Sequence, residues 1–181
     1  MKGCLVGVIL TLTGISLAVY FYFAKGMAPV ATTARPMPLE GKLANLALHA
    51  KIKKEMPRRI PMEANEANLL AGAHLYLTHC AVCHGTPGRA QTAIARGEFP
   101  KPPALFEGKG VTDDPPGETY WKVANGIRLT GMPGFDKSLS EDEMWQVSLL
   151  LASAHTLPSA AMEVLMAGPA PTMGAQANPM Q

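Results

Sequence analysis

The stretch Cys80-Ala81-Val82-Cys83-His84-Gly85 decides how this chain folds. It places a histidine directly after the second of two closely spaced thiols. Both cysteines can then form thioether bonds to one porphyrin edge, and the imidazole supplies an axial nitrogen to iron. A bare C-x-x-C would also fit a redox dithiol or half of a zinc site. The adjacent histidine, and the lack of a second cysteine pair, favour one covalent haem c held by Cys80 and Cys83, with His84 as a metal ligand.

Helical patterns lie on both sides of the motif. Gly72, Tyr76 and Cys80 recur every four residues, which puts them on one face of a helix leading into the haem motif. A short helix is expected over residues 118–125, ended by a glycine. A longer helix is expected after Ser140, which has the glutamate of a capping box three residues on.

With these residues in place, the chain resembles class I cytochrome c in its small bacterial form. The matching residues are Gly72 and Tyr76 before the motif, then Pro102-Pro103-Ala104-Leu105, Gly131-Met132-Pro133 and Trp145. The resemblance covers roughly residues 65 to 156. It implies an all-α fold, the small class I cytochrome c fold around a covalent haem, and a close crossing of helices at Gly72.

A methionine in the downstream loop is the expected second axial ligand. Met132 lies in a Gly-Met-Pro context, where its sulfur can be directed at iron opposite His84. A Met/His pair raises the reduction potential relative to histidine or thiolate ligation. Met144, Met62 and His155 are rival sixth ligands, but none of them has this loop context.

Three further residues are expected at the cofactor. The resemblance suggests the carbonyl of Pro102 or Pro103 as the hydrogen-bond acceptor of the second nitrogen of His84, which would fix the tautomer. A Pro-Pro pair also needs no function beyond stiffening a loop. Tyr120 and Trp121 are expected to border the haem, so the predicted cofactor-binding set adds Pro103, Tyr120 and Trp121 to the motif and the methionine.

The amino terminus carries a long apolar stretch. Residues 4–24 contain no charged side chain, and a helix of this length spans about 30 Å, the thickness of a hydrocarbon core. Tyr20 and Tyr22 lie near its end, where aromatic rings prefer the membrane interface. A cleaved signal peptide is the competing interpretation, but its apolar region is only about 7–15 residues and a small-x-small cleavage site is lacking here. We therefore expect residues 1–25 to form a single transmembrane helix.

Charge is divided unequally along the chain. Residues 25–61 carry eight Lys and Arg against two Glu, a net +6, whereas residues 65–156 have a net charge of −3. Nucleic-acid binding is therefore not expected, because the basic residues do not lie on the folded head. The basic segment suits a contact with lipid headgroups or an acidic partner, and equally a solvated linker face.

Four segments follow from these patterns. Residues 1–25 are the expected anchor, and residues 26–64 a Pro-rich, basic linker with a helix over about 39–56. Residues 65–157 are the expected haem domain, and residues 158–181 a flexible tail rich in Pro, Ala and Gly.

The function expected from the resemblance is electron transport by a membrane-tethered monohaem cytochrome, not enzyme catalysis on a small-molecule substrate. Its partners would be the lipid bilayer and membrane redox complexes of a respiratory chain, or it would be a permanent subunit of an oxidase, a reductase or a photosynthetic reaction centre. In the family, haem is attached outside the bacterial inner membrane, which implies a periplasmic head. Two alternatives stay open: a five-coordinate gas sensor or peroxidase, and a haem relay subunit of a dehydrogenase.

Overall fold

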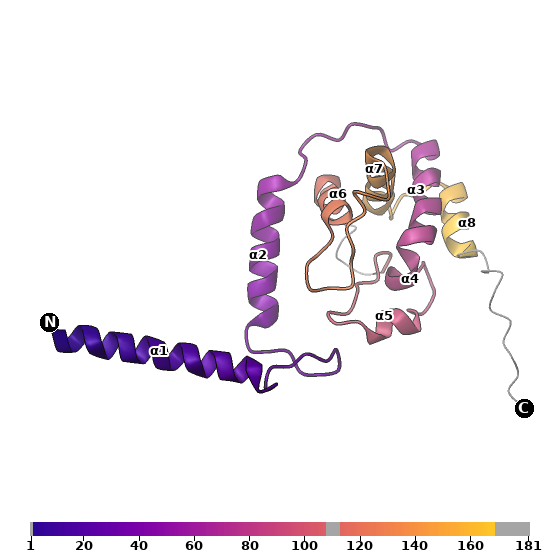
Figure 1. Cartoon of the computed structure of the whole chain (residues 1–181). Helices are drawn as coiled ribbons and strands as arrows, with labels where there is room; N and C mark the ends of the chain where they lie inside the picture. Colours follow the sequence, from indigo (N-terminus) through magenta and orange to yellow (C-terminus); the bar gives the residue numbers. More distant parts are fainter. Residues whose placement is uncertain (1, 108–112, 169–181) are drawn as a thin grey trace, which may run out of the picture. The chain divides into compact units, whose positions relative to one another are not determined.

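The computed structural model describes residues 2–107 and 113–168, and the regular structure within these residues is helical, without strands. The helices are α1 (Lys2–Ala24), α2 (Glu40–Glu55), α3 (Glu66–His79), α4 (Ala81–His84), α5 (Ala93–Gly97), α6 (Pro116–Asn125), α7 (Glu141–Ala152) and α8 (Ser159–Ala167) (Figure 1). The predicted all-α class is therefore confirmed. The chain forms two compact units, Met1–Asn45 and Leu46–Gln181.

In the first unit, α1 is 23 residues long and has no buried residue. It is the one helix in the described part of the chain that is long and apolar enough to cross a membrane. A soluble helix of this composition would normally bury its leucines and valines. Those of α1 are exposed, so the helix has an apolar surface without a protein partner.

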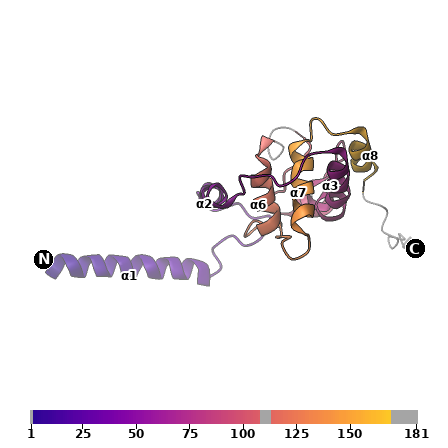
Figure 2. The same cartoon turned by 90° about the horizontal axis from the view of Figure 1, so that it is seen from above.

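The core of the second unit is a group of packed helices. α7 contacts both α3 and α6, and α3 also contacts α8. Figures 1 and 2 show α7 between α6 and α3 in both views. Tyr76, Val147, Leu150 and Leu165 are among the largest fully buried side chains, and they come from α3, α7 and α8.

The closest approach in this core occurs at Gly72 on α3. A Cβ atom added there would overlap the backbone carbonyl of Gln146 on α7 and lie 3.2 Å from the Cβ of Leu150. Only glycine lets the two helix backbones come this close. This is the helix crossing that the resemblance implied, and it sets the position of α3, which leads into the motif.

Polar caps fix where the two main helices begin. The Asn65 side chain accepts a hydrogen bond from the backbone N–H of Asn68 at the start of α3. The Ser140 side chain accepts one from the N–H of Glu143, whose carboxylate in turn accepts from the N–H of Ser140. The second pair is the predicted capping box, which satisfies two otherwise unpaired donors.

Two segments outside the expected haem domain are more ordered than the sequence suggests. Residues 159–167, assigned above to the tail, form α8 and bury Ala161 and Leu165. The part of α2 from Leu46 onward belongs to the second unit, and Ile52 in this part is only 2% exposed. The remainder of the expected tail, residues 169–181, lies outside the described residues.

Candidate haem site

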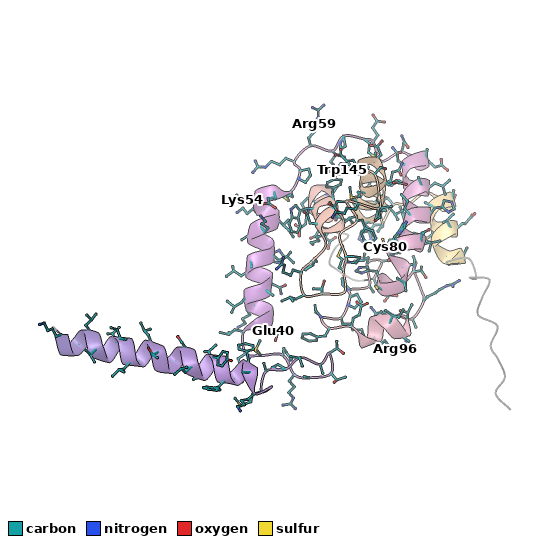
Figure 3. All side chains as sticks on the ribbon, viewed as in Figure 1. Glu40, Lys54, Arg59, Cys80, Arg96 and Trp145 are labelled. Carbon is teal, nitrogen blue, oxygen red and sulfur yellow. The ribbon has the colours of Figure 1, made fainter. Side chains whose placement is uncertain are left out.

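The motif forms one tight helical turn directly after α3. Cys80 ends α3, and its carbonyl accepts hydrogen bonds from the N–H groups of Cys83 at 3.1 Å and His84 at 2.9 Å. Both motif cysteines are free thiols of intermediate exposure. Cys80 lies beside the helix core of the second unit in Figure 3. The turn therefore presents two sulfur atoms and an imidazole from five consecutive residues.

Both thiols are held in the protonated form. Burial raises the pKa of Cys80 to about 12, and the charge of Cys83 adds to the effect. The pKa of Cys83 is raised by burial and by its hydrogen bond to Glu98. A reactive redox dithiol has at least one thiol with a lowered pKa. The pair therefore lacks the lowered pKa that is typical of a reactive redox dithiol.

The imidazole of His84 has one nitrogen engaged by the backbone. Its Nδ1 lies 2.8 Å from the carbonyl oxygen of Pro103, which accepts the Nδ1–H hydrogen bond. Burial lowers the pKa of His84, although the Pro103 contact opposes this shift. The neutral ring carries its proton on Nδ1 and leaves the Nε2 lone pair for a metal. Of the two candidate carbonyls, the structure places that of Pro103 against the ring.

Tyr76 ties the end of the motif back to α3. Its hydroxyl donates a 2.7 Å hydrogen bond to the carbonyl of Gly85, and its ring packs edge-on against Phe106 at 5.0 Å. The side chain is completely buried, and burial raises its pKa, so the hydroxyl keeps its proton. Tyr76 therefore stabilises the turn that carries the three chemical groups.

The loop that carries the predicted methionine ligand is closed at its base by two glycines. A Cβ on Gly126 would lie 2.6 Å from the backbone carbon of Pro133 and 2.5 Å from the nitrogen of Gly134. A Cβ on Gly134 would lie 2.8 Å from the carbonyl oxygen of Ala124. Gly126 also has a φ of 67°, a left-handed conformation that side chains disfavour. The two ends of the loop therefore pack backbone against backbone.

Hydrogen bonds inside the loop fix Met132 itself. Its carbonyl accepts from the N–H of Ile127 at 3.2 Å, and its own N–H donates to the Thr130 hydroxyl at 3.1 Å. The Thr130 hydroxyl in turn donates to the Ile127 carbonyl at 2.7 Å. The side chain of Met132 is partly buried against the hydrophobic core. Hydrogen bonds within the loop thus fix the backbone around Met132, and its role as a ligand stays a prediction.

The rival ligands have other surroundings. Met144 is 4% exposed and lies on α7, inside the core of packed helices. Met62 is of intermediate exposure and lies in the segment before α3, and His155 is exposed after α7. None of these three has the braced loop that holds Met132.

The two aromatic residues of α6 contact other helices. The ring of Tyr120 stacks on Trp145 of α7, with centroids 4.4 Å apart and planes 21° apart. The indole N–H of Trp121 donates to the Glu55 carboxylate at the end of α2, 3.3 Å away. Trp121 therefore has a partner that the sequence analysis did not foresee, and a haem contact of either ring stays a prediction.

One residue of the site was missed entirely. Cys83 donates its S–H to Glu98 Oε1 at 3.2 Å, and the other carboxylate oxygen would lie 2.6 Å from a Cβ on Gly131. Glu98 thus touches both the motif and the residue next to Met132. It lies in a loop without periodic pattern, and no spacing in the sequence connects it to the cysteine.

A cavity of about 610 Å³ lies on the His84 side of the site. Its lining combines the Pro-Pro segment, Phe106 and the charged residues Arg89, Lys101 and Glu107. This volume is typical of cofactor and ligand sites. None of its lining residues comes from the Met132 loop, so the cavity is next to His84 and does not include the region around Met132.

These residues fit a covalent haem. The paired sulfurs, a neutral imidazole with Nε2 free, and a thioether on a fixed loop are the donor set of a Met/His-ligated c-type haem. The protonated thiols are also the form consumed when a thioether bond forms with a vinyl group. The fit rests on chemistry and local geometry in this chain, with Cys80, Cys83, His84 and Met132 as the residues that would hold the group.

A family model and a solved structure are similar to this chain. The family model described as cytochrome c oxidase, cbb3-type, subunit III matches residues 67–149. No curated protein matches the chain significantly. A chain of the reducing HAO-like protein complex of Kuenenia stuttgartiensis is 30% identical over 52% of this chain and 46% of that chain, with a TM-score of 0.46.

This chain therefore spans about half the length of that structural neighbour. The family match runs from the first turn of α3 into α7, and so includes both the motif and the methionine loop. The predicted resemblance to c-type cytochromes is confirmed for residues 67–149, which match this cytochrome c family model.

Proposed function

We propose that this protein is a membrane-tethered carrier of single electrons, with one haem c ligated by His84 and Met132. One observation carries the proposal. The imidazole is held with Nε2 free, and a separate braced loop presents a thioether. When bound, the haem supplies a one-electron ferric–ferrous couple. The chain itself would hold the iron through His84 and Met132, which the Pro103 carbonyl and the hydrogen-bonded loop keep in position.

Two protein ligands distinguish electron transfer from substrate chemistry. Once imidazole and thioether both bind, iron has no open position for a gas or a peroxide. A gas sensor or peroxidase would leave the sixth position free or weakly held. The closed base of the loop at Gly126 and Gly134 argues for a ligand that stays in place.

The test of this choice is Met132→Ala in the haem-loaded full chain. The weak sulfur–iron band near the red end of the ferric spectrum should disappear, and the ferric iron should become able to bind added cyanide or imidazole more readily. Met144→Ala is the matched control, because it removes a thioether from the core and should leave the band in place. Survival of the band in Met132→Ala would assign the sixth ligand elsewhere and reopen the five-coordinate alternative.

The number of haems has its own test. The single C-x-x-C-H motif supports one covalent haem per chain. Mass spectrometry of the denatured protein should show one haem added and retained after acid–acetone extraction. An unmodified mass from a host with a working haem-attachment pathway would contradict covalent binding through Cys80 and Cys83.

Helix α1 supports the tether. Its 23 residues have the length and composition of a membrane span, and none of them is buried in the protein. The position of haem attachment in the family that the sequence resembles supports a head on the periplasmic side of a bacterial inner membrane. Full-length protein should resist extraction by salt and carbonate and need detergent. Mature protein in the soluble fraction, with an N-terminus beyond residue 24, would identify α1 as a cleaved signal peptide.

The electron donor and acceptor are proposed to be membrane redox complexes. Tethering raises the local concentration of the head near such complexes, which speeds encounter without changing the reduction potential. The same chain would serve as a permanent subunit of an oxidase, a reductase or a dehydrogenase if it copurifies in fixed stoichiometry. Purification in mild detergent distinguishes a free carrier from a subunit.

A further inference from the structure

Helix α2 carries two apolar stripes on opposite sides. At 100° per residue, Leu48 and Ile52 fall on one side, and Leu43, Leu46 and Ala50 fall on the other. Ile52 is 2% exposed, whereas Leu43 is 61% and Leu46 is 68% exposed. One stripe is therefore buried at its carboxyl-terminal end and the other faces solvent.

The buried stripe holds the end of α2 on the haem domain. Glu55 accepts the indole N–H of Trp121 on α6, and Ile52 is enclosed one turn earlier. Just after the helix, the carbonyl of Pro57 lies so close to Gly117 on α6 that a Cβ there would overlap it. The end of α2 and α6 therefore form one packed element within the second unit.

Cationic side chains border the exposed stripe. Helix geometry places Lys42 and Lys53 on one side of the leucines and Lys54 on the other. All three are exposed, and within the described part of the chain none of them forms an ion pair. Lys54 and Arg59 extend from the end of α2 and the segment after it in Figure 3. The solvent face of α2 is thus apolar along its middle and basic at its edges.

We propose that this face of α2 lies on the membrane surface and binds anionic phospholipid headgroups. Leucines flanked by lysines are the pattern of a helix in the plane of the interface, with its apolar stripe at the acyl boundary and ammonium groups at phosphates. An acidic protein surface would use the lysines and leave the leucines in water. The leucine stripe therefore selects the lipid surface over an acidic protein.

Chain length makes this docking feasible. This step rests on the proposed membrane span of α1. The segment between α1 and α2 covers residues 25–39, which reach at most about 50 Å when fully extended. Each lysine near an anionic surface strengthens binding by about fivefold. Because the opposite side of the helix end is packed on α6, docking would fix the orientation of the haem domain relative to the membrane.

The test uses the full, haem-loaded chain with Cys4→Ser in nanodiscs. A nitroxide label at Ala50→Cys reports on the exposed stripe without removing a leucine, and Ser138→Cys provides a label on an exposed loop of the head. Collision with oxygen and with a water-soluble nickel chelate is compared in phosphatidylcholine discs and in discs that also contain phosphatidylglycerol. The Ala50 label should be oxygen-accessible and nickel-protected in the anionic discs, and the Ser138 label should be nickel-accessible in both.

Two variants show which groups are responsible. Lys42→Gln with Lys53→Gln and Lys54→Gln should weaken the docking equilibrium by about a hundredfold, because three favourable charges are lost. Leu43→Ser with Leu46→Ser should restore nickel access at Ala50 even in anionic discs. Neither variant should alter the haem spectrum, since these side chains are exposed on α2.

The outcomes separate this inference from the proposed tether. Chains that enter the discs but keep a nickel-accessible Ala50 label would overturn docking and leave the tether intact. Chains that fail to enter the discs would overturn both. Equal protection in neutral and anionic discs would refute headgroup recognition. Protection from both oxygen and nickel would show that protein covers the stripe, either a second copy or a partner.

Discussion

Replacing Gly126 by alanine tests whether the closed base of the loop holds the methionine ligand. At a φ of 67° an L-residue costs about 1–2 kcal/mol. The new Cβ would also meet backbone atoms of Pro133 and Gly134 at 2.5–2.6 Å. Overpacking of this kind costs about 1–3 kcal/mol, and a backbone neighbour cannot rotate away. The expected loss of stability is therefore about 2–5 kcal/mol.

Gly88 supplies the matched control. It has a φ of 68°, and a Cβ built there would meet nothing within 4 Å. Gly88→Ala should therefore cost only the conformational term, about 1–2 kcal/mol. Denaturant unfolding of the haem-loaded proteins, followed by absorption, gives the difference, and the sulfur–iron band reports on Met132. Equal destabilisation by the two substitutions, with the band unchanged in both, would refute the idea that close backbone packing positions the ligand.

Three further substitutions test other contacts. Gly72→Ala should lower stability by about 1–3 kcal/mol, because the new methyl group would overlap a backbone carbonyl of α7. This loss should exceed the gain from the better helix propensity of alanine. A melting temperature at or above that of the parent would contradict the close crossing of the two helices. Glu98→Gln removes a negative charge beside the Cys83 sulfur and should raise the reduction potential by about 40 mV, the equivalent of about 1 kcal/mol. An unchanged potential in spectroelectrochemistry would show that the Glu98 charge does not act on the haem. The pKa of Glu55 is lowered by its hydrogen bond to Lys51 and then by that to Trp121, so its stabilisation is present above the unfolded pKa near 4.5 and is lost as pH falls through the lower folded pKa. The hydrogen-exchange protection factors of α2, which correct for the intrinsic pH dependence of exchange, should therefore fall below about pH 4.5, and Glu55→Gln should remove this fall.

The haem motif and the main helices were predictable because their signals are local. Covalent attachment imposes a fixed spacing on Cys80, Cys83 and His84, so the chemistry is visible in five residues. The starts of α3 and α7 are set by side chains that cap the same turn, at Asn65 and Ser140. Such interactions join residues three positions apart and leave a recognisable pattern.

The contacts of Glu98 and of the loop glycines were not predictable in the same way. Glu98 reaches a cysteine fifteen positions away through the irregular segment that contains α5. The need for glycine at positions 126 and 134 arises only when the chain returns on itself. Neither the periodicity nor the composition of a sequence predicts contacts between backbone segments that are far apart along the chain.

The packing of α2 and the existence of α8 were missed for two different reasons. The two apolar stripes of α2 lie on opposite sides of the helix, so its sequence shows no single apolar face. The helix was therefore predictable, but its packing on α6 was not. The sequence predicts a flexible tail from residue 158 onward, yet Pro158 directly precedes α8. Proline cannot continue a helix but suits the start of one, because its fixed φ is helical and its missing N–H is not needed there.

The two proposed ligands, His84 and Met132, are held in similar ways, which would suit the proposed electron transfer. The His84 ring is fixed by the backbone carbonyl of Pro103, and the Met132 loop is fixed by backbone contacts at Gly126 and Gly134. Neither of these two backbone contacts depends on a flexible side chain that would have to move when the iron is oxidised or reduced. Ligands held in place beforehand keep the rearrangement between oxidation states small. The proposed mobility of this molecule therefore belongs to the tether and to the docking of α2, which would change how the head meets its partners while the ligand geometry stays fixed.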